Sequence, residues 1–101
     1  MAKVLVVNKS CHDFQQAEEY GELVYMTEGA IGRFNTSKMF RAFKPFIDKS
    51  NPEDYILLTG LAVMNSIACA MFAAKHGKVN LLIYKDKKGQ QGMYIEKTVV
   101  V

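Results

Sequence analysis

The sequence predicts an α/β domain built around a mostly parallel sheet. Three short runs are apolar at every position, around Val4–Val7, Ile56–Leu58 and Leu81–Ile83. Continuous rather than alternating apolar residues are typical of strands that are buried on both faces, as strands of parallel sheets are. Segments with helical periodicity separate these runs, so strands and helices alternate along the chain, which favours the α/β class.

The elements are expected in the order strand, helix, strand, helix, strand, helix, strand, strand. We predict strands over 3–8, 22–27, 55–59, 79–85 and 93–101, and helices over 13–20, from 35–37 onward and over 62–76. Right-handed crossovers then give the strand order 2-1-3-4-5, with the C-terminal strand antiparallel at an edge. In topology this order resembles small flavodoxin-like and Rossmann-like domains, and it forms a single domain over residues 1–101.

Local signals support the ends of the predicted helices. Asn35 opens a run of three residues that favour the N-cap position of a helix. Gly77 is a plausible end for the last helix, where Lys75 and His76 suit the negative end of the helix dipole. Pro45 lies inside the pattern of the second helix, and we expect it to kink or split that helix because proline removes a backbone donor.

Composition excludes several classes of protein. Half of the residues are apolar and the formal net charge is only +3, which favours a folded domain and does not argue for nucleic-acid binding. The two cysteines, Cys11 and Cys69, form no C-x-x-C motif, and their spacing to the histidines signals no metal site. We therefore expect reduced thiols in a cytoplasmic protein, with no metal, no cofactor and no membrane segment.

Polar residues follow the predicted strands at the edge where α/β sheets bind ligands, namely outside the carboxyl ends at the switch between strands 1 and 3. The candidate ligand-binding residues at this edge are Asn8, Ser10, His12, Glu28, Arg33, Asn35, Thr59, Gly60 and Asn65. Gly60 leads into a helix N-terminus, whose free N–H groups attract phosphate. The alternative interpretation is that strand ends and tight turns are polar in any α/β protein, and no G-x-G-x-x-G or P-loop motif is present.

The run Cys11-His12-Asp13 raises the question of catalysis. A nucleophile needs a base and an orienting group within hydrogen-bond reach, and consecutive loop residues seldom converge in that way. His12 is therefore kept as a weak catalytic candidate, and the sequence favours a binding protein over an enzyme. The phenylalanines at 34, 40, 43 and 46 are interpreted as core residues, since three of them recur at helical spacing.

Three functions remain open. The leading hypothesis is a stand-alone protein that binds a small anionic, nucleotide-like ligand, of the kind a phage or mobile element uses to sequester a signal. The alternatives are a ligand-free protein that binds or inhibits another protein, and a small hydrolase that uses His12.

We also expect a homo-oligomer, most simply a dimer. The predicted order places the second and third helices on one face of the sheet, which leaves only the short first helix on the other. In addition, one side of the helix over 62–76 carries small uncharged residues where a solvated helix normally shows charge. A twofold partner is the commonest way to cover such surfaces.

Overall fold

The computed structural model describes residues 2–9, 14–59 and 61–101. A five-stranded sheet in the order β2-β1-β3-β4-β5 forms its centre, with parallel pairing from β2 to β4 and antiparallel pairing between β4 and β5. The strands are β1 (Lys3–Val6), β2 (Glu22–Tyr25), β3 (Tyr55–Leu57), β4 (Lys78–Lys87) and β5 (Gln90–Val100). The predicted fold class, strand order and antiparallel edge strand are therefore confirmed.

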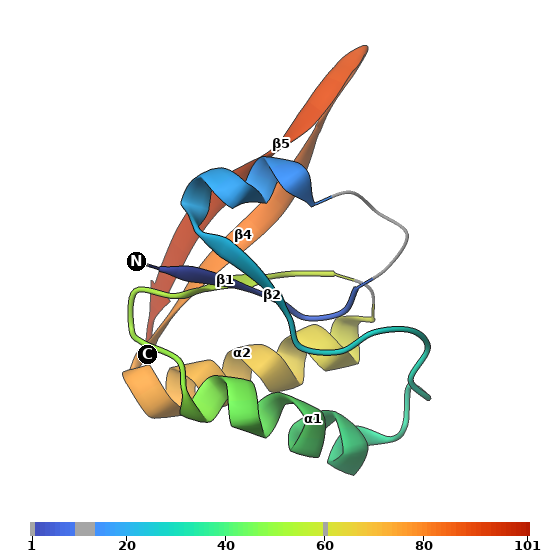
Figure 1. Ribbon diagram of the computed structural model, residues 1–101, viewed down its shortest axis with the longest axis vertical. Helices are drawn as coiled ribbons and strands as arrows, with labels where there is room; N and C mark the ends of the chain where they lie inside the picture. The colour runs from blue at the N-terminus through green and yellow to red at the C-terminus, as the bar shows by residue number, and fades with distance from the viewer. Residues whose placement is uncertain (1, 10–13, 60) are drawn as a thin grey trace.

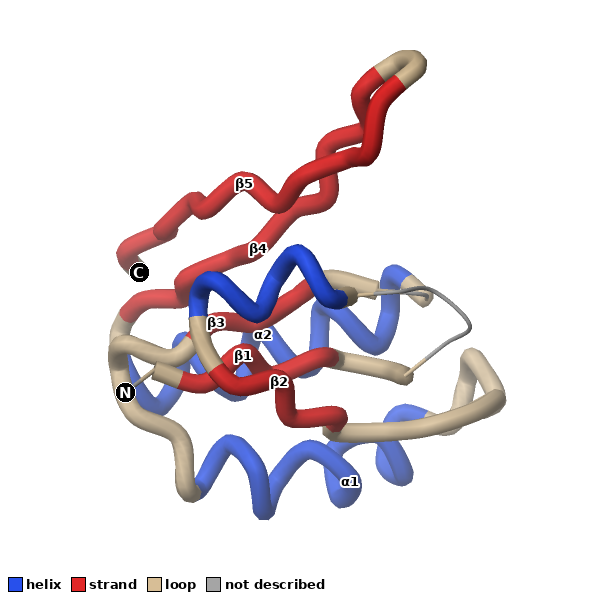
Figure 2. The backbone as a smooth tube through the Cα atoms, turned by 45° about the horizontal axis from the view of Figure 1, so that its top comes forward, coloured by secondary structure: helices blue, strands red, loops and turns tan. Residues whose placement is uncertain are grey.

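Three helical segments connect the strands. They are the 3-10 helix η1 (Gln15–Tyr20), α1 (Thr36–Asp48) and α2 (Ala62–His76). Figure 1 shows α1 and α2 together on one face of the sheet and η1 alone on the other, as the right-handed crossovers predict. Figure 2 shows the same two layers of helix in a second view.

The apolar strands supply a core to each face. On the α1 and α2 side, Leu5 and Ile56 pack into one cluster with Phe43, Met64 and Phe72. On the η1 side, a smaller cluster joins residues of β1, β3, β4 and β5 to η1 and the residue before it, namely Val4, Val6, Phe14, Ala17, Leu57, Leu82 and Tyr94. Burial on both faces explains why these strands are apolar at consecutive positions.

Helix α1 runs without a break from Thr36 to Asp48 although it contains Pro45. The expected split is therefore wrong. Pro45 is exposed, as is Arg41, whose carbonyl loses its helical donor to the proline ring. Water can take the place of that donor at an exposed position, so the helix tolerates the proline.

The C-terminal ends of α1 and α2 are joined by Lys75. Its ammonium group donates to the carbonyls of Ile47 at 3.1 Å and Ser50 at 3.3 Å, and also to that of Asp48. The sequence suggested that Lys75 complements the dipole of its own helix. In the structure it also satisfies the last carbonyls of the neighbouring helix.

The β4–β5 hairpin is longer than predicted. Both strands continue to a short turn at Lys88 and Gly89, where Gly89 has a φ of +75°. The prediction stopped both strands early because residues 86–92 are mostly polar or glycine. This part of the hairpin extends beyond the rest of the sheet, where backbone pairing does not require an apolar sequence (Figure 1).

Candidate functional site

The carboxyl ends of β1 and β3 meet, as expected, through Asn8 and Thr59. The backbone N–H of Asn8 donates to Thr59 Oγ1 at 2.9 Å, and the same hydroxyl donates to the carbonyl oxygen of Asn8 at 3.2 Å. Asn65, in the first turn of α2, accepts a hydrogen bond from the backbone N–H of Thr59 at 3.1 Å. Three of the predicted residues therefore form one hydrogen-bonded group.

The side chain of Asn8 also holds the loop that follows β2. Its Nδ2 donates to the carbonyl oxygen of Gly29 at 3.1 Å, and its Oδ1 lies 3.0 Å from the hydroxyl of Thr27. Among the described residues, no buried side-chain nitrogen or oxygen lacks a hydrogen-bond partner. The polar residues at this edge thus hold the strand ends and loops together.

The remaining described candidates lie around this group. Glu28 forms an exposed ion pair with Lys9 at 4.0 Å, a type of contact that contributes little to stability. Asn35 caps α1, since its Oδ1 accepts from the backbone N–H of Lys38 at 3.3 Å. Arg33 is exposed two residues before that cap. Ser10, His12 and Gly60 lie outside the described residues, as does the Cys11-His12-Asp13 run.

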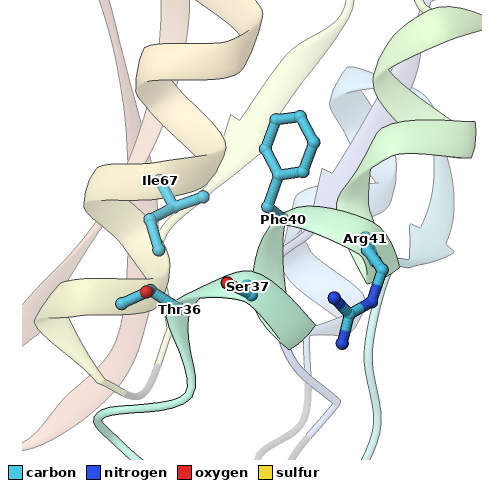
Figure 3. A pocket seen from close by; sticks show the side chains of 5 residues that line it. All are labelled: Thr36, Ser37, Phe40, Arg41 and Ile67. Carbon is cyan, nitrogen blue, oxygen red and sulfur yellow. The ribbon is translucent and has the colours of Figure 1, made fainter.

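A hollow opens beside this edge, between the start of α1 and the middle of α2. Its volume is about 410 Å³, and it is lined by Thr36, Ser37, Phe40, Arg41 and Ile67. In Figure 3 the Ile67 side chain and the Arg41 guanidinium lie on opposite sides of the Phe40 ring, with the two hydroxyl residues at the base of α1. The hollow therefore combines two hydroxyls, one cation and one aromatic ring.

The electrostatics of this hollow favour an anion. The first turn of α1 contains no acidic residue, and the free N–H groups of a helix N-terminus carry partial positive charge. Arg41 adds a full positive charge, and a guanidinium forms bidentate hydrogen bonds with phosphate or carboxylate.

The interpretation of all four phenylalanines as core residues is wrong for two of them. Phe43 is fully buried, whereas Phe34 is 90% exposed and Phe40 is 47% exposed. Sequence reasoning therefore missed Phe40 and Arg41 as site residues. The signal that could have found them is an aromatic residue beside an arginine in the second turn of a helix that follows a glycine-containing loop.

Two residues that do not line the hollow, Cys69 and Tyr55, have shifted pKa values. Burial raises the pKa of the Cys69 thiol, which makes this half-buried cysteine a poor nucleophile. A hydrogen bond to the Glu96 carboxylate, 2.6 Å away, raises the pKa of Tyr55 to about 12. Within the described part of the chain, no three histidine, cysteine or acidic side chains cluster as a metal site would require.

The comparisons with known proteins identify one family. Residues 2–100 match the family described as Phage Pam3 gp32-like protein. The chain belongs to this family. It is therefore a small phage-related protein, which agrees with the phage setting that the sequence suggested. No curated protein and no solved structure matches the chain. None of the described helices has the length and apolar composition needed to span a bilayer.

Proposed function

We propose that this phage-related protein binds a small anionic ligand of the nucleotide class in the hollow at the start of α1. The observation that carries the proposal is the combination of a cationic guanidinium, two hydroxyls and an exposed aromatic ring around one hollow of about 410 Å³. A nucleotide has a matching pair of groups, since it joins an anionic phosphate to a flat base.

Each lining residue has a distinct role in this proposal. The hydroxyls and backbone N–H groups of Thr36 and Ser37 donate hydrogen bonds to the phosphate, together with the guanidinium of Arg41. The ring of Phe40 stacks on the base, a contact that tolerates different bases because each has a flat aromatic surface. Arg33 supplies a second cation from the loop before α1. Asn8, Thr59 and Asn65 act indirectly, by holding the neighbouring strand ends in place.

In a phage-related protein, such binding would sequester a nucleotide signal rather than transform it. The hydrolase alternative depends on His12, which lies outside the described residues. The sequestering role requires only affinity, and the hollow provides a site for affinity without any described pair of catalytic groups.

The test is calorimetry and thermal melting with ATP, cyclic dinucleotides and inorganic pyrophosphate. A ligand at a hundred times its dissociation constant adds about 2.7 kcal/mol to the free energy of unfolding, which is readily seen in a melt. We expect Arg41→Gln to weaken binding of every anion about tenfold or more, because it removes a charge-assisted hydrogen bond. Phe40→Leu should weaken ATP but leave pyrophosphate unaffected.

The matched control is Lys44→Gln, which removes the same charge from the next turn of α1, where Lys44 pairs with Asp48 at 3.2 Å outside the hollow. If Lys44→Gln weakens binding as much as Arg41→Gln, the attraction comes from general surface charge. That result, or the absence of any shift with millimolar nucleotide, would contradict the proposed function.

A further inference from the structure

The β4–β5 hairpin forms an arm that reaches beyond the rest of the sheet. β3 pairs with β4 only from Asn80 to Leu82, whereas β4 and β5 pair from Lys78 to Lys87. Figures 1 and 2 show the outer half of the hairpin standing clear of the other strands and the helices. β5 lies at the end of the strand order, with β4 on one side and no described strand on the other.

The hairpin exposes apolar side chains on both of its strands. Ile83 is 39% exposed, Met93 is 40% exposed and Val99 is 50% exposed. In the β4–β5 register these three share the face on which α1 and α2 lie, since Val79, which packs with α2 residues, is opposite Val99, and Ile83 is opposite Ile95. Ile83 and Met93 both neighbour Ile95 on this face, and an exposed apolar cluster of this kind marks an interaction site in many proteins.

A β-bulge at the register shift opposite Lys85–Lys87 protects the outer end of β5 from pairing with another strand, whereas the regular part of the strand, from Met93 to Val100, has few such devices. Its sequence contains no proline, and its charged residues are Glu96 and Lys97. The Glu96 carboxylate turns inward across β4, where it accepts the Tyr55 hydroxyl at 2.6 Å. Lys97 therefore remains as the only charged side chain of β5 that is not drawn back over the sheet.

The backbone of β5 presents hydrogen-bonding groups along this edge. The N–H of Val101 donates to the carbonyl oxygen of Gly77, the residue opposite, at 2.9 Å. Because hydrogen-bonded pairs alternate along an antiparallel ladder, the odd-numbered residues between Met93 and Val101 bond to β4, and the even-numbered ones point their N–H and C=O groups outward. The carbonyl of Tyr94 accepts the Tyr20 hydroxyl at 3.0 Å, and a carbonyl oxygen can accept a second bond.

A twofold pairing of β5 with itself has few possible registers. Residues opposite each other in the two strands must lie on the same face of the sheet. The twofold axis must therefore pass between the two copies of a single residue, which is the centre of the register. Centres at Glu96 or Lys97 place like charges directly opposite each other, which is unfavourable. A centre at Ile95 pairs Met93–Lys97, which lies in the regular part of the strand beyond the bulge, and avoids this repulsion.

We propose that two copies of this chain associate through antiparallel pairing of their β5 strands, centred on Ile95, to form one continuous ten-stranded sheet. Met93 of one copy then lies opposite Lys97 of the other, and Tyr94 lies opposite Glu96. This dimer goes beyond ligand binding at α1 and does not depend on it.

The size of the contact predicts a reversible dimer. The five residues from Met93 to Lys97, at ~3.4 Å each, give a regularly paired segment ~17 Å long, and with a sheet about 10 Å thick each copy buries roughly 170 Å². Both copies together then bury roughly 340 Å², well below the ~1,200 Å² of the smallest standard interfaces. Association is therefore expected only at high concentration, on the order of hundreds of micromolar.

The first test is sedimentation equilibrium of the full chain from 1 to 300 µM. We expect the mass to rise with concentration from 11.4 kDa toward twice that value. Ile95→Lys should abolish the rise because it places two lysines opposite each other, and an equimolar mixture of Ile95→Lys with Ile95→Glu should restore it. Restoration in the mixture also shows that both variants fold.

The second test fixes the register by cross-linking. In a Cys11→Ser, Cys69→Ser background, Ile95→Cys should give a disulfide-linked dimer on oxidation with diamide. Ile95 and its copy would form a non-hydrogen-bonded pair, in which the two Cα atoms lie ~4.5 Å apart. Lys97→Cys is the matched control and should not cross-link, because its two copies lie four residues apart. A monomer at every concentration would overturn the proposal. So would a dimer that survives Ile95→Lys but is lost in Ala70→Lys, which places a charge on the exposed side of α2.

Discussion

At the amino end of the sheet two polar side chains, Asp54 and Asn80, are buried, whereas at the carboxyl end the polar side chains around the hollow reach solvent. Asp54, just before β3, is fully buried, and its two carboxylate oxygens accept the backbone N–H groups of Lys3 and Asn51, both at 2.9 Å. Asn80 is buried beside it and donates to the carbonyl oxygens of Pro52 at 2.8 Å and Asp54 at 2.9 Å. At the carboxyl end, Arg33 and the residues of α1 that line the hollow are mostly exposed.

This difference separates polar residues that hold the fold from those available to a ligand. A fully buried carboxylate whose two oxygens already accept backbone N–H groups is closed to a partner from solvent, and its removal costs stability. An exposed arginine on a helix costs little to remove, and its loss is felt only when a ligand binds. If this is correct, substitutions at the amino end of the sheet should lower stability, and substitutions around the hollow should lower ligand affinity.

The largest effect is expected at the amino end. Asp54→Ala leaves two backbone N–H groups without their charged acceptor, so the free energy of unfolding should fall by about 3 kcal/mol. Asp54→Asn is the matched control and should cost about half as much, because its amide keeps one acceptor oxygen. Urea denaturation measures both values. Losses below about 0.5 kcal/mol would mean that this network does not hold the strand ends.

An intermediate effect is expected at Thr59. Thr59→Val keeps the shape of the side chain but removes both hydrogen bonds to the backbone of Asn8, so stability should fall by about 1–2 kcal/mol. Thr59→Ser should retain most of it. Nucleotide affinity of the folded Thr59→Val variant should change less than twofold, since Thr59 does not line the hollow. A tenfold loss of affinity at full stability would instead place Thr59 in the ligand site.

The smallest effect is a dependence on pH through His76. The Ser50 hydroxyl donates its single proton to the carbonyl oxygen of Ile47 at 2.6 Å, so His76 Nε2, which lies 2.8 Å from Ser50 Oγ, must carry the donor hydrogen. Burial, and then the neighbouring Lys75, lower the pKa of His76 from its ordinary value of 6.5.

Because this pKa is lower in the folded protein, the unfolded chain binds the proton more readily. The stabilisation from neutral His76 is complete above pH 6.5 and is lost as the pH falls below that value. The melting temperature of the natural protein should therefore decrease more between pH 7.5 and 5.5 than that of His76→Gln, which keeps an N–H donor for Ser50. Parallel decreases in the two proteins would argue against this role of His76.

The sequence alone determined the class and order of the fold. Apolar runs without alternation identify strands that are covered on both faces, and the handedness of crossovers leaves one natural strand order. The bounds of α2 were also predicted correctly as 62–76, because Gly77 adopts a left-handed φ of +74° that ends the helix locally. These features depend on short-range chemistry that the residues themselves carry.

Only the tertiary structure decided which side chains are available for binding. The periodicity of Phe40 and Phe43 is helical in both cases, yet Phe43 enters the core and Phe40 lines a hollow. Asn8 and Thr59 are 51 positions apart, and their mutual hydrogen bonds exist only because β1 and β3 are neighbours. The length of the β4–β5 arm likewise depends on strand pairing rather than on apolar pattern. Burial and pairing are set by what lies opposite a residue in space, and the spacing of residues along the chain does not specify that.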